Sequence, residues 1–214
     1  LPDTHKQILT TQYRMIENIG NLISKVFYRG IIDTGCNDDE KRHGLSRYVG
    51  KSIVWFDTSA NKKKSQKRTK GGSYINEEEK RIILEILDDL KSTGELKGLD
   101  IGIITGYSGQ KELLRKSIKA TGLDKIASKI DINTLDAFQG RENDIIIYST
   151  VRTRDSIGFQ KEKERVNVAF SRAKKLLIVC GDKNFFYNFD DQDNKFVEII
   201  DYISEEEECE IIQC

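Results

Sequence analysis

Residues 132–152, INTLDAFQGRENDIIIYSTVR, decide the fold class of this chain of 214 residues. Residues 165–182, RVNVAFSRAKKLLIVCGD, repeat the same arrangement. Each stretch joins a polar, charged segment to an apolar run of mostly β-branched residues. Such runs are typical of strands buried on both faces of a parallel sheet. In open α/β sheets, polar groups beside strand ends line the ligand crevice, so the two stretches suggest an arginine-bearing wall for a phosphate ligand.

The rest of the chain continues the alternation of strands and helices. Asn76 is expected to cap a helix, because Glu79 follows three residues later as in a capping box. Strands are expected at 52–56, 100–105, 129–133, 145–150 and 175–180, and further helices at 13–27, 110–121, 162–173, 184–189 and 195–203. The pattern predicts an α/β fold with a mainly parallel sheet covered by helices on both faces.

One domain is expected over residues 1–203, followed by an acidic tail at 204–214. Residues 30–50 are expected to form a loop, and residues 57–72 a loop insertion that carries the basic run NKKKSQKRTK. The formal net charge is zero, with 35 Lys and Arg against 35 Asp and Glu, so overall charge does not point to nucleic acid.

The composition also limits the cellular setting. There is no apolar run long enough to span a membrane and no signal peptide, so no membrane contact is expected. The four cysteines and two histidines lack metal-ligand spacing, and no metal site is expected in this chain. A reducing, cytoplasmic location is predicted.

Five sequence elements resemble, in family order, motifs of superfamily 1 helicases. QYRM at 12–15 with FYRG at 27–30, SYIN at 73–76 with Glu79, and GIITGY at 102–107 with Gln110 precede the two stretches above, which resemble motifs V and VI. The similarity is greatest to the branch that contains the nonsense-mediated-decay helicase. A single short motif is a weak indication, whereas five in order are strong. The chain departs from the family at Ile16-Glu17 (usually His-Pro) and at Gly106 (usually Pro).

The resemblance implies a RecA-like fold of the P-loop NTPase type, but the sequence lacks its own P-loop. Gly50-Lys51-Ser52 is not one, because Leu45 stands where the first glycine is required and a strand follows. The chain is therefore expected to be the C-terminal motor domain. ATP with Mg²⁺ would bind between it and an N-terminal motor domain that carries the P-loop and the metal ligands.

The resemblance also assigns residues to the nucleotide. Arg172 would be the arginine finger on the γ-phosphate, and Arg14 a second phosphate ligand; these are the two expected catalytic residues. Tyr13 would stack on the adenine, and Glu142 would accept a hydrogen bond from the ribose. The remaining expected ATP-binding residues are Gln139, Gly140 and Arg165. Arg165 and Arg172, seven positions apart, are expected to point the same way from one helix.

A separate set of residues is expected on the nucleic-acid side, where they would hold phosphates of a single strand of DNA or RNA without reading sequence. They are Thr105, Tyr107, Gln110 and Thr134. The basic run at 61–70 either extends this track or forms a solvated loop.

Two functions follow from these patterns. The first is the C-terminal domain of an ATP-dependent DNA or RNA helicase, which is expected to be inactive in isolation. The alternative is a stand-alone module that binds nucleic acid or protein without catalysis. The presence of Arg14, Arg172 and Glu142 together favours the first, since a scaffold does not need all three.

Overall fold

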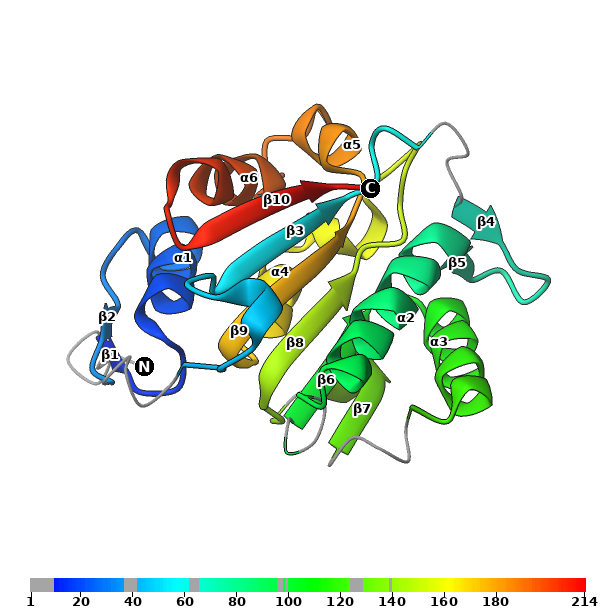
Figure 1. Cartoon of the computed structure of the whole chain (residues 1–214). Helices are drawn as coiled ribbons and strands as arrows, with labels where there is room; N and C mark the ends of the chain where they lie inside the picture. Colours follow the sequence, from blue (N-terminus) through cyan, green and yellow to red (C-terminus); the bar gives the residue numbers. More distant parts are fainter. Residues whose placement is uncertain are drawn as a thin grey trace.

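A six-stranded parallel sheet forms the centre of the molecule (Figure 1). The computed structural model describes residues 10–36, 42–61, 66–95, 98, 100–123, 129–138 and 140–214. The strand order is β10-β3-β9-β8-β6-β7, and every neighbouring pair is parallel. The strands are β3 (Ile53–Asp57), β6 (Asp100–Thr105), β7 (Lys129–Thr134), β8 (Asn143–Ser149), β9 (Ala173–Gly181) and β10 (Cys209–Gln213). The predicted α/β class with a mainly parallel sheet is confirmed.

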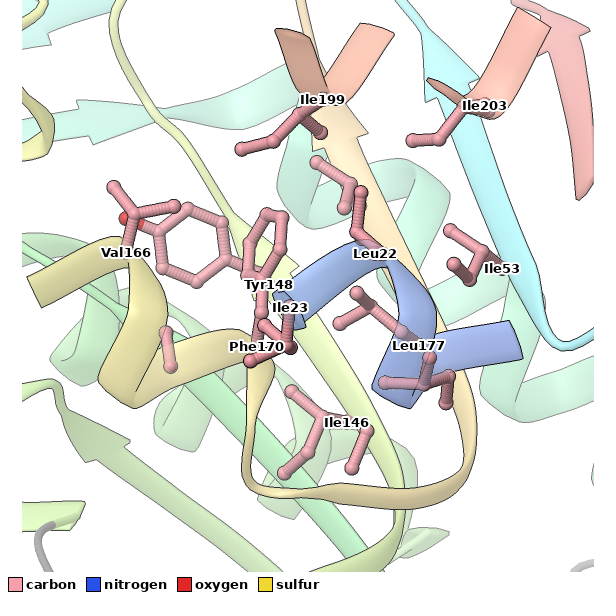
Figure 2. Close-up of a cluster of buried hydrophobic side chains, with 14 of the residues drawn as sticks. Leu22, Ile23, Ile53, Ile146, Tyr148, Val166, Phe170, Leu177, Ile199 and Ile203 are labelled. Carbon is pink, nitrogen blue, oxygen red and sulfur yellow. The ribbon is translucent and has the colours of Figure 1, made fainter. Parts of the chain in front are cut away.

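Helices cover both faces of the sheet. One face carries α1 (Glu17–Tyr28), α4 (Lys163–Phe170), α5 (Lys183–Tyr187) and α6 (Phe196–Glu205), and the other carries α2 (Glu77–Ser92) and α3 (Ser108–Thr121). Strand β8 shows why both faces are covered: Ile146 and Tyr148 pack in one apolar cluster, and Ile145 and Ile147 in the other. In Figure 2, Tyr148 lies beside Val166 and Phe170 of α4, and Leu22 of α1 lies between Tyr148 and Ile53.

The cap of α2 forms as predicted. The side-chain oxygen of Asn76 accepts hydrogen bonds from the backbone N–H groups of Glu78 at 3.0 Å and Glu79 at 3.1 Å. Helix α1 begins later than predicted, at Glu17. Before it, the Gln12 side chain accepts hydrogen bonds from the backbone N–H groups of Arg14 at 2.9 Å and Met15 at 2.8 Å, which fixes a non-helical turn.

The expected acidic tail is wrong. Helix α6 extends to Glu205, and residues 209–213 form β10, which pairs with β3 at one edge of the sheet (Figure 1). Cys209 is buried, and Ile211 and Ile212 pack against opposite apolar clusters. The alternation of these side chains, and not the run of glutamates before them, determines the structure of the segment.

The two expected loops contain short strands. Within 57–72, β4 (Gln66–Arg68) pairs antiparallel with β5 (Tyr74–Asn76), so part of the basic run belongs to a hairpin. Lys62, Lys63 and Lys64 lie outside the described residues. Within 30–50, β2 (Asp33–Thr34) pairs with β1 (Thr11–Gln12), and Ser46–Tyr48 form a 3₁₀ turn.

Helix α4 is shorter than the expected 162–173. It ends at Phe170, and β9 begins at Ala173, so only a tight turn at Ser171 and Arg172 joins the two elements. Arg172 therefore lies in a turn and not on the helix that carries Arg165. Further 3₁₀ turns lie at Asp136–Phe138 (η5) and Gly158–Lys161 (η6).

Candidate functional site

Several segments bring basic side chains together around Glu142, next to the amino ends of β8 and β9. Glu142 directly precedes β8, and Lys174 is the second residue of β9. Arg14 Nε lies 2.7 Å from one Glu142 carboxylate oxygen, and Lys174 Nζ lies 3.3 Å from the other. The pKa of Glu142 is held below its usual value, first by the Arg14 hydrogen bond and further by Lys174. We call Arg14, Glu142, Arg172 and Lys174 the arginine cluster.

Hydrogen bonds to backbone carbonyls hold Arg172 in the arginine cluster. Its Nε donates to the carbonyl of Val168 at 2.9 Å, and its Nη1 to that of Arg141 at 3.4 Å. Arg14 Nη1 donates to the carbonyl of Ser171 at 3.3 Å, directly beside Arg172. Partial burial and the nearby charge of Arg14 lower the pKa of Arg172, so the site crowds cations together. Such crowding favours an anionic ligand, and a guanidinium is suited to phosphate because it is always charged and donates in a planar fork.

Tyr13 stands beside Arg14 with 69% of its surface exposed. A Cβ atom on Gly35 would lie only 2.5 Å from Tyr13 Cε1, so glycine at this position leaves room for the ring. An exposed aromatic ring next to a cation is a suitable surface for a base. Gly140 has φ +82°, a backbone conformation that favours glycine, in the loop before Glu142. Gln139, which was assigned to the same site, lies outside the described residues.

The arginine cluster lies at the amino ends of β8 and β9. Ligand crevices in open α/β sheets commonly lie at the carboxyl ends, so this site occupies the opposite strand ends. The reason is the chain path: a parallel strand can begin only after the chain has returned along the sheet. The 3₁₀ turn η5 and residues 140–142 lie on the return before β8 and place Glu142 there, and α4 lies on the return before β9 and is followed by Arg172.

Arg165 does not join the arginine cluster. It lies in the first turn of α4, where its Nε donates to Glu162 at 2.7 Å and its Nη1 lies 3.8 Å from Asp136. Its guanidinium lies 5.1 Å from the ring centroid of Phe159. Helix α4 begins near the carboxyl end of β8 and ends near the amino end of β9. Its first turn, which carries Arg165, and the turn after the helix, which carries Arg172, therefore lie toward opposite edges of the sheet. The expectation that Arg165 and Arg172 point the same way is wrong.

The four residues expected on the nucleic-acid side do gather at the carboxyl ends of β6 and β7. Thr105 and Thr134 are register partners on these strands. Thr105 and Gln110 are fully buried, and Tyr107 is 4% exposed, whereas Thr134 is half-buried. The Gln110 amide donates to the backbone carbonyl of Asn76 at 3.1 Å and to Ser149 Oγ at 3.1 Å, so its observed role is to tie α3 to α2 and β8.

Sequence reasoning missed the wider role of Glu79, which it placed in a capping box and in a motif resemblance without naming its partners on β8 and beyond. This carboxylate is fully buried and accepts hydrogen bonds from Ser149 Oγ at 2.5 Å, the Val151 backbone N–H at 2.8 Å and Thr150 Oγ1 at 3.1 Å. Val151 has φ +69°, which is strained for a β-branched residue. Burial raises the pKa of Glu79 to about 8, although these donors act in the opposite direction. The spacing of Asn76 and Glu79 was the visible signal, but the partners on β8 are distant in sequence.

Two further observations concern the described part of the chain. Within it, no group of three or more His, Cys, Asp or Glu side chains is placed to hold a metal ion. Its helices are all too short or too polar to cross a membrane.

Comparison with known proteins places this chain in a family. The chain matches the family described as "AAA domain" over residues 2–184 and belongs to that family. It is 36% identical over 185 residues to helicase Sen1 of Saccharomyces cerevisiae, covering 81% of this chain and 8% of that protein. It is 32% identical over 181 residues to a homolog of regulator of nonsense transcripts 1 from Neurospora crassa, covering 81% and 16%.

An archaeal relative matches more of the chain. An uncharacterized ATP-dependent helicase of Methanocaldococcus jannaschii is 33% identical over 220 residues, which cover 96% of this chain and 31% of that protein. The chain thus spans less than a third of each of these relatives. Together with the family match, they identify a domain of the superfamily 1 helicase type, homologous to DNA and RNA helicases.

The similarity to a solved structure is weaker. The C-terminal domain of a possible DNA helicase from Lactobacillus plantarum has a TM-score of 0.45 and 16% identity, covering 80% of this chain and 88% of that one. The fold description therefore rests on the sheet of this chain itself.

Proposed function

We propose that this chain is the C-terminal motor domain of an ATP-dependent DNA or RNA helicase, in which it completes a nucleotide site whose P-loop lies in a second domain. The observation that carries the proposal is the arginine cluster: Arg14 and Arg172, 158 positions apart, converge beside the Ser171 carbonyl. Relatives that are helicases by name support the same function.

The two arginines would act on the triphosphate. Both would neutralise the negative charge that develops on the γ-phosphate during transfer to water. Arg14 is held by Glu142 in the structure, so an incoming phosphate would compete with that carboxylate. Lys174, 3.3 Å from Glu142, can keep the carboxylate in place after Arg14 turns to the phosphate. Glu142 would then accept from the ribose, and Tyr13 would stack on the base.

The rest of the nucleotide machinery would come from the other motor domain. Mg²⁺ would help to neutralise the negative charge of the triphosphate, and its protein ligands would lie with the P-loop in the other domain. Single-stranded nucleic acid would cross the carboxyl edge of the sheet near Thr134, which is half-buried, at the opposite strand ends from the nucleotide. Contacts to the phosphates of this strand would carry no sequence information and would not distinguish DNA from RNA.

The test compares the 214-residue chain with the full-length protein that contains it. Phosphate release from ATP is measured for both, with and without single-stranded nucleic acid. The proposal predicts turnover only by the full-length protein, stimulated by the strand. Turnover by purified chain alone would overturn the division of the site between two domains. A full-length protein that binds strands without any turnover would instead support the non-catalytic module.

A further inference from the structure

Three aromatic rings form a row at the carboxyl edge of the sheet. The ring centroids of Tyr74 and Tyr107 lie 5.6 Å apart, and those of Tyr107 and Phe159 lie 5.4 Å apart. Tyr74 is half-buried and Tyr107 is 4% exposed, but Phe159 is 44% exposed. The row therefore begins inside the domain and ends with a phenylalanine ring in solvent.

The residues on either side of Phe159 hold it in this position. Gly158 has φ +62°, and a Cβ atom there would lie 2.1 Å from Tyr107 Oη, so only glycine permits this close approach. Gln160 is 1% exposed, and its amide donates to the backbone carbonyl of Thr150 at 2.5 Å. Because Gly158 and Gln160 both pack against the interior, the turn that they form leaves the Phe159 side chain exposed.

Gly106 leaves one flank of Phe159 uncovered. A Cβ atom on Gly106 would lie 3.6 Å from both Cβ and Cδ2 of Phe159, which is ordinary contact distance. Any residue larger than glycine would therefore cover part of the ring. This is the position at which the chain departs from the TPY pattern of the helicases that it resembles.

Two arginine side chains lie against rings of this row. The guanidinium of Arg152 lies 4.1 Å from the Tyr74 ring centroid, and that of Arg165 lies 5.1 Å from the Phe159 ring centroid. Beyond Tyr74, the β4–β5 hairpin adds the exposed residues Lys67, Arg68 and Lys70, and the exposed Arg154 donates to the backbone carbonyl of Gln66 in β4 at 3.5 Å. Asp136, Asp155 and Glu162 neutralise part of this charge, but cations still predominate along the row.

We propose that Phe159 is a stacking platform for a base of single-stranded nucleic acid, with neighbouring phosphates directed toward Arg154 and the β4–β5 hairpin. An exposed aromatic ring flanked by cations matches the two chemical features of a single strand, a π-face and a phosphate chain. Arg165 and Tyr107 both lie against the Phe159 ring, at 5.1 and 5.4 Å from its centroid, and the 44% of Phe159 that stays exposed is the surface offered to the base. The inference rests on the proposed function, because it requires the chain to bind single strands.

The test separates bases from phosphates. Fluorescence anisotropy measures binding of the 214-residue chain to a short oligothymidylate and to an abasic oligomer with the same number of phosphates. The wild type should bind oligothymidylate more tightly. Phe159→Ala should lose about tenfold in affinity for oligothymidylate, the scale of one stacked base, and little for the abasic oligomer.

Two further variants make the result specific. Phe159→Trp keeps a flat ring and should retain affinity, and its fluorescence should be quenched on binding, against the background of the buried Trp55. Val49→Ala removes another exposed apolar side chain, 76% exposed in a different segment, and should bind as the wild type does. Thermal melting of each variant checks the fold.

The outcomes distinguish the inference from the proposed function. If the wild type prefers oligothymidylate and Phe159→Ala keeps that preference, the platform is wrong while strand binding stands. Equal binding of both oligomers by the wild type would also exclude stacking. If the wild type binds neither oligomer, the strand-binding part of the proposed function fails together with the inference.

Discussion

Glu142 accepts a hydrogen bond from Arg14 Nε at 2.7 Å, although the two residues are 128 positions apart in the sequence. The contact joins the turn before α1 to the loop before β8. It therefore brings Glu142, which is expected to bind the ribose of ATP, next to Arg14, which is expected to bind a phosphate. Both side chains are partly exposed, at 38% and 43%. An ion pair exposed to this degree contributes at most about 1 kcal/mol to folding, so a phosphate could displace Glu142 from Arg14 at little cost to stability.

The ribose role of Glu142 gives the first prediction. In the full-length protein, the wild type should bind ATP about tenfold more tightly than 2′,3′-dideoxy-ATP, because a carboxylate that accepts from a hydroxyl contributes about 1.5 kcal/mol or more. Glu142→Ala should bind the two nucleotides alike. Isothermal titration measures both affinities. A variant that still prefers ATP to the same degree would assign the ribose contact to another residue.

Glu79 gives a prediction about stability. Glu79→Ala leaves the buried donors of Ser149, Thr150 and Val151 without their acceptor, and should lower the free energy of unfolding by about 2–4 kcal/mol. Urea denaturation of the 214-residue chain measures the loss. Glu85→Ala, on the exposed side of the same helix, is the control and should change stability by less than about 0.5 kcal/mol. A loss no larger than that of the control would show that the network does not stabilise the fold.

The same residue predicts a pH dependence. Burial raises the folded-state pKa of Glu79 to about 8, above its ordinary value of 4.5, so folding favours the protonated form. This contribution to stability is complete below about pH 4.5 and is lost as the pH rises toward 8, at up to about 1.4 kcal/mol per pH unit. Glu79→Gln does not titrate. The difference in unfolding free energy between wild type and Glu79→Gln should therefore shift against the wild type from pH 5 to pH 8, and a constant difference would contradict the raised pKa.

Strand β10 predicts the effect of truncation. Removing residues 209–214 exposes the edge of β3 and removes Cys209, Ile211 and Ile212 from the two apolar clusters. The free energy of unfolding should fall by about 3 kcal/mol or more, since each buried apolar side chain contributes about 1.5–3 kcal/mol. If these residues were a solvated acidic tail, their removal would leave the melting temperature unchanged. The truncated chain therefore distinguishes a packed strand β10 from a solvated tail.

The sequence predicted the sheet well because its central strands carry local signals. The run from Ile145 to Tyr148 is apolar on both faces, and that pattern admits few structures other than a buried strand. The cap at Asn76 is equally local, since donor and acceptor lie within three residues. Family resemblance, and not spacing, grouped Arg14 with Glu142 and Arg172, because Arg14 lies more than a hundred positions before the other two residues.

Other features could not be predicted because their causes are not local. No glycine or proline marks the end of α4 at Phe170, so Arg172 was placed on the helix. The burial of Gln110 depends on Asn76 and Ser149, which only the folded chain brings within 3.1 Å. Strands as short as β4, with three residues, carry too little periodicity to be distinguished from a loop.

In the proposed function, Arg172 acts on the γ-phosphate. The direct measurement is single-turnover ATP hydrolysis by the full-length protein carrying Arg172→Ala. The chemical step should slow by about 10³-fold, the scale of an arginine finger. Strand binding without nucleotide and thermal stability should change little. Arg172→Lys should be nearly as slow, because a point charge on a flexible stem does not reproduce the planar fork.

A surface arginine provides the control for this measurement. Arg81→Ala removes a guanidinium that pairs only with Glu78 and Glu85 on α2 among the contacts described, and should hydrolyse ATP at the wild-type rate. The result that supports the account is a slow chemical step in a folded Arg172→Ala protein with a normal Arg81→Ala control. An Arg172→Ala protein whose folded fraction hydrolyses ATP at the full rate would contradict the γ-phosphate role and would leave Arg172 its structural contacts to Val168, Arg141 and Ser171.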